Sequence, residues 1–425
     1  MDIDKVPKSV GKTLEIKGWV WRKRESKDII FLVIRDSNDV VQCTIKDSHK
    51  DFKKAQKLTI ESSVILKGRV TKDKRAPTGY EIKISKLEPV HIAERFPITK
   101  DKSTEFLLDT RHLWLRSRYM TAVMKVRHTV VGAIHKFFRD RGYYEFDPPI
   151  FQPIQCEGGS TLFEVKYFDD ITYLTQSWQL YAEAAVFALE KVYDVAPTFR
   201  AERSKTSRHL SEFWMAEMEA AWMDLKEVTE VAKDEVRFII KEVLKHNKKE
   251  LELLGQDIKK LERIVKKPFP TITYTKALEI LEKKGGMKIQ WGKDLRTIEE
   301  DNLMEHFDTP IVVTHYPKEI MAFYKQRDPK EPKTALCFDM LSPEGYGELV
   351  GGSQRDTDIK ELIESLKKMG ESPKGYEWYM DLRRFGSVTH SGYGLGVERL
   401  VAWLCKLDNI KDSIPFPRTM LRFRP

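Results

Sequence analysis

The sequence has few cysteines and no long apolar run. Its four cysteines are widely scattered, at Cys43, Cys156, Cys337 and Cys405. They form no C-x-x-C pair, which argues against a zinc knuckle or a disulfide framework. No apolar run approaches the ~18 residues needed to cross a bilayer, so no membrane partner is expected. The opening sequence MDIDK lacks an apolar signal core, which predicts a cytoplasmic protein.

Length and charge restrict the fold and the partners. The chain has 425 residues, more than one ordinary hydrophobic core supports, and two domains are therefore expected. It carries 74 Lys and Arg against 65 Asp and Glu, a net charge of +9, which is compatible with an anionic partner such as RNA. Because 33% of the residues are charged, a heavily ion-paired surface explains the same composition.

Short stretches with the composition of β-strands occupy the N-terminal part of the chain. They span residues 14–20, 29–34, 40–45, 63–70 and 80–85, with a short helix expected over 51–58. Five strands with a helix after the third predict a small closed barrel of the OB type, which commonly binds single-stranded nucleic acid. Phe31 and Gln42 lie on neighbouring strands, where an exposed ring stacks on an unpaired base and an amide reads a base edge. Burial of Phe31 in the barrel core is the alternative.

A helix and a strand are predicted after a hinge. Residues 91–110 have mixed charge, little periodicity and a proline, as linkers do. Apolar residues then recur at helical spacing between 111 and 141, most of which is predicted to be one helix ended by Gly142. A strand is expected over 143–151, although its Pro148-Pro149 pair is typical of an edge strand or a turn.

The segment from 199 to 219 concentrates charge in a predicted hairpin of two strands. Its first strand and its loop carry Arg200, Glu202, Arg208 and His209. Period-two alternation places Phe213, Met215, Glu217 and Glu219 on one face of the second strand. Carboxylates in register with apolar residues are costly to bury unless they bind something, and cations facing acids suit a zwitterion plus a polyphosphate. A solvated, salt-bridged hairpin is an equally open interpretation.

Two glycine-rich stretches follow later in the chain. Glu348 precedes a Gly-Gly pair, Arg355 lies seven residues further on, and Asp339 is on the preceding strand. An acidic residue beside close-approach glycines suits a metal ion that bridges phosphates, whereas a glycine turn with an ion pair is the simpler interpretation. The stretch from Gly392 to Arg399 matches neither the P-loop nor the dinucleotide-binding fingerprint.

Three segments, in this order, resemble the motifs of class II aminoacyl-tRNA synthetases of the aspartyl/asparaginyl subclass. The sequence GYYEFDPPI at 142–150 resembles motif 1, FRAE with RHLSEF at 199–213 resembles motif 2, and GYGLGVER at 392–399 resembles motif 3. The resemblance covers nearly the whole chain and implies an α+β fold. It implies an OB-fold anticodon-binding domain over 1–90, a hinge over 91–110, and a catalytic domain over 111–425 with a mainly antiparallel sheet flanked by helices.

The resemblance also implies the roles of individual residues. ATP would be bound by Arg200, Glu202, Arg208, His209, Leu210, Phe213, Glu348, Gly396, Glu398 and Arg399, with Arg200 and Arg399 as catalytic residues. The amino acid would be bound by Glu157, Gln179, Arg200, Glu217, Glu219 and Arg355. Mg²⁺ would be held by Glu348, helped by Asp339. Phe31 and Gln42 would contact the central anticodon base of the tRNA, and Pro149 would lie in the interface of a homodimer.

The choice between aspartate and asparagine must be electrostatic, because the two amino acids are nearly isosteric. In aspartyl enzymes of the subclass a lysine follows the Gln-Leu-Tyr element, whereas Ala182 follows it here. Without that lysine the second oxygen of aspartate is left unpaired, at a cost of roughly a few kcal/mol. The amide of asparagine needs a donor, which Arg355 supplies, and an acceptor, which is either Glu217 or Glu219. Asparagine is therefore the predicted substrate.

Other functions remain as alternatives. An aspartyl-tRNA synthetase with relaxed tRNA choice is disfavoured by Ala182, and also by Gly351 and the tail at 414–418, which look asparaginyl. A ligase that makes asparagine on the same catalytic fold is disfavoured by the N-terminal barrel, which relatives of that kind lack. A non-catalytic RNA-binding paralogue is disfavoured by an intact set of chemical groups, Arg200, Glu202, Glu348 and Arg399.

Overall fold

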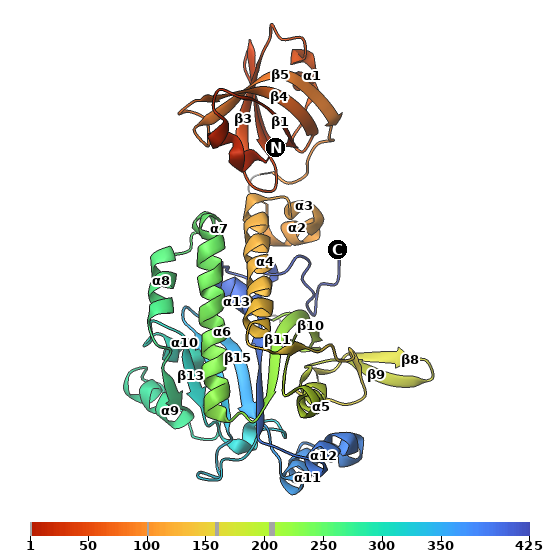
Figure 1. The fold of residues 1–425 in the computed structure, drawn as a ribbon, viewed down its shortest axis with the longest axis vertical. Coiled ribbons are helices and arrows are strands. Elements are labelled where there is room, and N and C mark those ends of the chain that lie inside the picture. The colour runs from red at the N-terminus through yellow and green to blue at the C-terminus, as the bar shows by residue number, and fades with distance from the viewer. Residues whose placement is uncertain (1, 100–101, 158–160, 204–208) are drawn as a thin grey trace. The chain divides into compact units, whose positions relative to one another are not determined.

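The computed structural model describes residues 2–99, 102–157, 161–203 and 209–425. The chain forms two compact units, one up to Trp114 and the other from Leu115 onward, each with its own hydrophobic core (Figure 1). No helix in these described ranges is both long enough and apolar enough to cross a membrane.

The first unit is built around a closed five-stranded barrel, as the sequence predicts. Its elements are the 3-10 helix η1 (Ile3–Ser9), the strands β1 (Thr13–Glu25), β2 (Ile29–Arg35), β3 (Val40–Lys46), β4 (Ser63–Lys72) and β5 (Tyr80–His91), and the helix α1 (Phe52–Lys57). The strands close in the order β1-β2-β3-β5-β4, which confirms the OB-type barrel. Alternation along β2 sends Ile30 and Leu32 into the core and leaves Phe31 half-buried on the outer face.

The long helix that follows begins later than the pattern indicates. The short helices α2 (Thr104–Asp109) and α3 (Arg111–Trp114) come first, and α4 (Arg118–Arg139) is the long one. Ser117 caps α4, because its Oγ accepts a hydrogen bond from the N–H of Met120 at 3.1 Å. The N-cap therefore sets the start of the helix.

The continuous strand predicted over 143–151 is wrong. Only two short strands form there, β6 (Tyr144–Glu145) and β7 (Phe151–Gln152), and they belong to different sheets. Pro148 and Pro149 lie between them, and neither has an N–H to donate to a neighbouring strand. The proline pair ends one pairing and lets the chain change sheets.

A mainly antiparallel sheet of eight strands forms the centre of the second unit, as predicted. Its order is β12-β13-β14-β15-β16-β11-β10-β6, and only the pairings β12–β13 and β10–β6 at its edges are parallel. Its strands besides β6 are β10 (Lys191–Phe199), β11 (Glu212–Ala221), β12 (Thr271–Thr273), β13 (Ile311–Thr314), β14 (Cys337–Ser342), β15 (Gly347–Gln354) and β16 (His390–Gly396). A separate sheet pairs β7 with the hairpin of β8 (Glu164–Tyr167) and β9 (Asp170–Leu174).

Helices cover one face of the large sheet and leave the other face to polar side chains. The helices α4, α6 (Leu225–His246) and α13 (Val397–Leu404) pack together on the sheet (Figure 1). Ala216, Met218 and Ala220 of β11 lie in that core, so alternation turns Glu217 and Glu219 to the opposite face. The remaining helices are α5 (Gln179–Leu189), α7 (Lys248–Leu253), α8 (Ile258–Lys266), α9 (Tyr274–Lys283), α10 (Thr297–Met304), α11 (Ile359–Lys368) and α12 (Glu377–Arg384).

Candidate active site

One cavity lies among β11, β15, β16 and the start of α13. It has about 670 Å³ of empty space, part of which is open to solvent. Nine of the ten residues predicted to bind ATP line it: Arg200, Glu202, His209, Leu210, Phe213, Glu348, Gly396, Glu398 and Arg399. Arg208, the tenth, lies outside the described residues. The tertiary structure thus gathers residues that are up to 199 positions apart in the chain.

Arg200 follows β10 directly and lines this cavity. Its guanidinium lies 5.5 Å from the centre of the Phe213 ring, and its Nε is buried without a hydrogen-bond partner among the described residues. Burial opposes its charge, but the carboxylates of Glu157 and Glu348 outweigh that effect and raise the pKa of Arg200. A charged guanidinium with an unused, buried donor is suited to bind an anion.

Glu348 and Arg399 contact each other across the cavity wall. The Nη1 of Arg399 donates to the backbone O of Glu348 at 2.6 Å and lies 3.8 Å from its Oε2. A Cβ added at Gly351 would lie 2.4 Å from Oε1 of Glu348 and 3.6 Å from Oδ1 of Asp339. Because glycine has no side chain, the carboxylates of Glu348 and Asp339 can both occupy the space beside position 351.

The carboxylates around Glu348 form an acidic region. Asp339 pairs with Gly351 in the ladder of β14 and β15, and burial together with the charge of Glu348 raises the pKa of Asp339 to about 7. Glu300 of α10 is a further carboxylate here, and burial with the charge of Glu348 raises its pKa to about 8. Glu300 was not predicted from the sequence, because no motif marks α10. Carboxylate oxygens are the ligand type that a divalent cation such as Mg²⁺ prefers.

Glu398 lines the cavity, but its carboxylate also holds the fold together. Its Oε1 lies 2.7 Å from Nη1 of Arg127 on α4, and its Oε2 accepts a hydrogen bond from the N–H of Trp214 at 2.9 Å. These contacts tie the start of α13 to α4 and to β11. Glu398 therefore has a structural role, in addition to its predicted role in binding ATP.

Arg355 and Glu219 form a buried ion pair next to this cavity. The Nε of Arg355 donates to Oε1 of Glu219 at 3.0 Å, and its Nη2 donates to Oε2 at 2.8 Å. The Nη1 of Arg355 donates to Oγ of Ser353 at 2.8 Å, and the guanidinium lies 5.3 Å from the centre of the Tyr324 ring. Burial opposes the charge of Arg355, but Glu219 outweighs it and raises the pKa of the guanidinium. Arg355 was predicted to read the amino-acid side chain together with either Glu217 or Glu219, and Glu219 is the one that lies against it.

Glu217 lies on the same face two residues earlier. Its Oε1 accepts a hydrogen bond from Oγ of Ser177 at 2.6 Å, and its Oε2 accepts one from the N–H of Trp178 at 2.9 Å. Burial raises the pKa of Glu217 to about 7, although these two hydrogen bonds lower it. The sequence left the choice between Glu217 and Glu219 open. Both carboxylates are buried on the same face of β11, and Glu219 is the one that pairs with Arg355.

Gln179 opens α5 and is held by a buried carboxylate that the sequence analysis missed. Its Nε2 donates to Oε1 of Glu183 at 3.0 Å, and its backbone N–H donates to Oγ of Ser177 at 3.1 Å. Arg383 donates to Oε2 of Glu183 at 2.6 Å, and Nε2 of His390 lies 3.0 Å from the same oxygen. The i, i+4 spacing of Gln179 and Glu183 was the one available signal.

Glu157, predicted to bind the amino acid, comes directly before residues 158–160 of the glycine-containing loop 155–161, and those three residues lie outside the described ranges. Its Oε1 accepts a hydrogen bond from the hydroxyl of Tyr324 at 2.5 Å. Gln176 accepts hydrogen bonds from the N–H groups of Cys156 and Glu157, at 3.2 and 3.1 Å, and donates to Oγ1 of Thr161 at 2.7 Å. Gln176, which carries no motif, therefore holds both described ends of the loop.

Ala182 occupies an apolar position in α5. It is fully buried and belongs to a cluster with Trp178, Ala185, Val186 and Val192.

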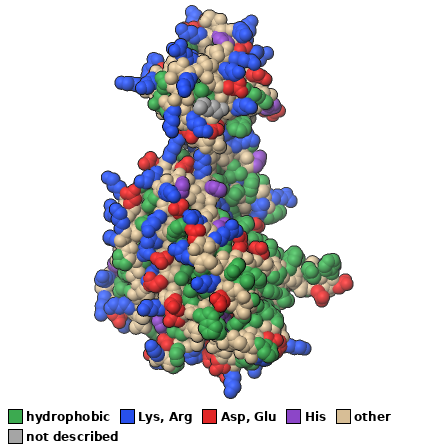
Figure 2. Space-filling model, viewed as in Figure 1, with side chains coloured by type: hydrophobic (Ala, Val, Ile, Leu, Met, Phe, Trp, Pro, Cys, Tyr) green, Lys and Arg blue, Asp and Glu red, His purple; other side chains and the backbone are tan. Residues whose placement is uncertain are grey.

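The barrel presents Phe31 and Gln42 on one outer face. Phe31 pairs with Thr44, and Val33 pairs with Gln42, so the two predicted residues are diagonal neighbours on adjacent strands. Arg24 lies over the Phe31 ring at 4.8 Å, and Nε2 of Gln42 donates to Glu81 at 2.8 Å. Figure 2 shows many Lys and Arg side chains on this unit.

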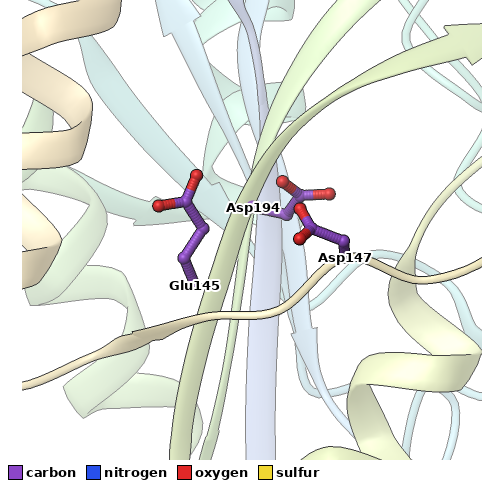
Figure 3. Close-up of side chains that lie close together, drawn as sticks. All are labelled: Glu145, Asp147 and Asp194. Atoms are coloured by element: carbon purple, nitrogen blue, oxygen red, sulfur yellow. The ribbon is translucent and has the colours of Figure 1, made fainter.

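A second acidic cluster lies at β6 and β10, outside this cavity. Carboxylate oxygens of Glu145, Asp147 and Asp194 lie within 4.8 Å of one another (Figure 3). Glu145 is already paired with Arg139 and accepts a hydrogen bond from Tyr193 at 3.3 Å. Because protein donors satisfy Glu145, we assign no metal ion to this cluster. Pro149, predicted at a dimer interface, is exposed a few residues further on.

Two known protein families match this chain, one for each of its two units. The family described as tRNA synthetases class II (D, K and N) matches residues 103–420, and the OB-fold nucleic acid binding domain matches residues 14–90. The chain therefore belongs to the class II tRNA synthetases.

Its relatives place it more finely within that class. The asparagine–tRNA ligase of Thermococcus kodakarensis is 49% identical over 99% of this chain and 98% of its own, and that of Symbiobacterium thermophilum is 46% identical over 100% and 99%. The crystal structure of asparaginyl-tRNA synthetase from Pyrococcus horikoshii complexed with asparaginyl-adenylate has a TM-score of 0.96 and 46% identity, and the match covers 100% of this chain and 99% of that one. Within the class, the chain belongs to the asparagine–tRNA ligases.

Proposed function

We propose that this protein activates asparagine with ATP, releasing pyrophosphate, and then transfers the asparaginyl group from the adenylate to the 3′ end of a tRNA. The observation that carries this is a site with two parts of different charge. In the cavity, the Nε of Arg200 is buried without a hydrogen-bond partner among the described residues. In the second part, Arg355 is already neutralised by Glu219 of β11, a strand that also lines the cavity. The first part suits ATP, and the second suits a neutral amino-acid side chain.

The first step brings two anions together, the carboxylate of asparagine and the α-phosphate of ATP. Positively charged donors that hold both in line are therefore the main requirement, and no side-chain nucleophile is needed. We assign this role to Arg200, which can donate to both groups. Arg399 and His209 would hold the outer phosphates, Glu202 would contact the adenine, and Phe213 would stack on it.

Mg²⁺ is part of the proposal, with Glu348 and Asp339 as its protein ligands. When bound, it supplies positive charge to the polyphosphate. The raised pKa of Asp339, caused by burial and by the charge of Glu348, indicates carboxylates that a cation would stabilise.

Selection of asparagine follows from charge balance. Glu219 engages two donors of Arg355 and could turn one oxygen to the amide N–H₂ of the substrate, while Arg355 donates to its oxygen. Aspartate would add a negative charge next to Glu219. Ala182 occupies the position of the lysine that aspartyl enzymes have, and alanine cannot compensate this charge. The pocket therefore favours the amide over the acid.

The deciding experiment is the exchange of pyrophosphate into ATP with purified protein, without tRNA. Exchange is expected with asparagine and not with aspartate. Exchange with aspartate alone would contradict the asparagine assignment. Absence of exchange with either amino acid would favour an RNA-binding or an asparagine-forming function.

We propose that the barrel reads the tRNA anticodon through Phe31 and Gln42. Replacing Phe31 by alanine is expected to raise the KM for tRNA by about tenfold, because stacking on one base contributes ~1–3 kcal/mol. Pyrophosphate exchange without tRNA should not change, because Phe31 lies in the other unit. The measurement is aminoacylation at varied tRNA concentration.

The matched control for this prediction is Trp19→Ala. Trp19 is an exposed aromatic residue of the same barrel, 41% accessible and packed beside Arg35. Its removal should leave the KM for tRNA nearly unchanged. Equal effects of the two substitutions would count against specific stacking on Phe31.

We also propose that the protein is a homodimer in the cytoplasm. Large apolar side chains are exposed on and around the sheet β7-β9-β8, namely Ile150, Phe151, Tyr167, Phe168 and Ile171. Hydrophobic side chains gather around this hairpin in Figure 2. A contiguous exposed apolar patch is typical of an interaction surface, and Pro149 borders it.

Replacing Ile171 by aspartate should therefore separate the two copies, because symmetry places the change twice in the interface. Sedimentation equilibrium should show the mass falling to the 49.7 kDa of one chain. Val90→Asp changes an equally exposed residue, 62% against 57%, in the first unit and should leave the mass unchanged. A wild-type protein that sediments as a single chain would refute the homodimer.

A further inference from the structure

Glu183 is a buried carboxylate that contacts Gln179 of the proposed amino-acid pocket and was not assigned a role from the sequence. It is fully buried and is contacted by hydrogen-bonding groups from two elements besides its own helix, α12 and β16. Its Oε2 faces Nη2 of Arg383 and Nε2 of His390, at 2.6 and 3.0 Å, while the hydroxyl of Tyr379 lies 2.8 Å from each oxygen. Burial opposes its charge, but Arg383 and His390 outweigh that and lower the pKa of the Glu183 carboxyl.

An ionised carboxylate only accepts hydrogen bonds, and this determines the orientation of Gln179. The amide nitrogen of Gln179 must face Oε1 of Glu183, at 3.0 Å, because the amide oxygen has nothing to receive from it. The amide oxygen then remains as an acceptor that no described group uses. Gln179 was predicted to bind the amino acid, and its backbone N–H donates to Oγ of Ser177, which in turn donates to Glu217 of the proposed amino-acid pocket.

We propose that Glu183 is a positioning residue that fixes the amide of Gln179 so that its oxygen accepts a hydrogen bond from an N–H group of the amino acid. This inference rests on the proposed activation of asparagine. The contact with the amino acid is made by Gln179, and Glu183 acts through it.

The substitution Glu183→Gln tests the orientation directly. Arg383 can only donate, so it keeps an oxygen at the Oε2 position, and the new amide nitrogen is forced to the Oε1 position. That nitrogen faces the nitrogen of Gln179, which must turn over and present a donor to the amino acid. The KM for asparagine in pyrophosphate exchange should then rise about tenfold or more, with the KM for ATP unchanged.

A second substitution should restore binding. In Gln179→Glu with Glu183→Gln, the new carboxylate accepts from the new amide and again presents an oxygen to the amino acid. The KM for asparagine is expected to return to within about threefold of wild type, which a merely structural role of Glu183 would not produce. This variant restores the internal hydrogen bond, so it keeps the test decisive where E183Q by itself fails to fold.

The control is Tyr379→Phe, which removes another donor to Glu183 without changing the partner of Gln179. Its KM for asparagine should be near wild type. An unchanged KM in E183Q, or a double variant as weak as Q179A, would overturn the proposal. A wild-type protein without asparagine-dependent exchange would instead refute the proposed function, so the two failures are distinguishable.

Discussion

Replacing Arg200 by lysine is expected to lower asparagine-dependent pyrophosphate exchange by about 10³-fold. Lysine keeps the charge but loses the planar fork that can bind two oxygens at once. Donors aimed at the charge that develops in the transition state each contribute about 10²–10³-fold to a rate, and Arg200 is proposed to serve two groups. The assay is the initial rate of exchange at saturating ATP and asparagine.

The control for Arg200 is the same substitution at Arg237. Arg237 lies on α6, where its Nη1 pairs with Asp234 at 2.8 Å and its guanidinium packs over Phe269. Arg237→Lys should leave the exchange rate unchanged. If Arg200→Lys kept a rate near wild type, the positively charged group that joins the substrates would have to be another residue.

Replacing Glu348 by glutamine is expected to lower the exchange rate by about 10²-fold and to raise the Mg²⁺ concentration required for half-maximal rate. A metal ion on the phosphates contributes several kcal/mol, and each 1.36 kcal/mol is a factor of ten. Glutamine keeps the size of the side chain and its backbone contact with Arg399, so the change is confined to charge. The measurement is a magnesium titration of exchange, and an unaltered titration would contradict the assignment.

Substitutions at two neighbouring glycines distinguish a change in Mg²⁺ binding from a loss of folding. Gly351→Ala puts a Cβ 2.4 Å from Oε1 of Glu348, which is the mobile end of a side chain, so the protein should fold while its carboxylate is displaced. Gly352→Ala puts a Cβ 2.5 Å from the ring of Phe338 and 2.6 Å from Cβ of Tyr393, both buried. The first variant should show the altered magnesium titration, and the second should mainly lower the melting temperature.

Local patterns in the sequence predicted which face of a strand each side chain lies on. Alternation along 212–221 placed Glu217 and Glu219 on one face, and the structure has both there. Five strand-like stretches, with a helix after the third, predicted the N-terminal barrel. The continuous strand predicted at 143–151 is wrong, because two prolines interrupt the pairing of strands there.

The arrangement of the site depends on contacts between residues that are far apart in the chain. Arg355 meets Glu219 across 136 residues, and Arg383 meets Glu183 across 200. No local pattern reports such pairs, since they exist only where helices and strands pack. The sequence by itself determined which residue types face the site, because side-chain direction follows the backbone period. Only the tertiary structure decided that Glu219 pairs with Arg355 and that Glu183 orients Gln179, because buried charges take partners according to distance in space.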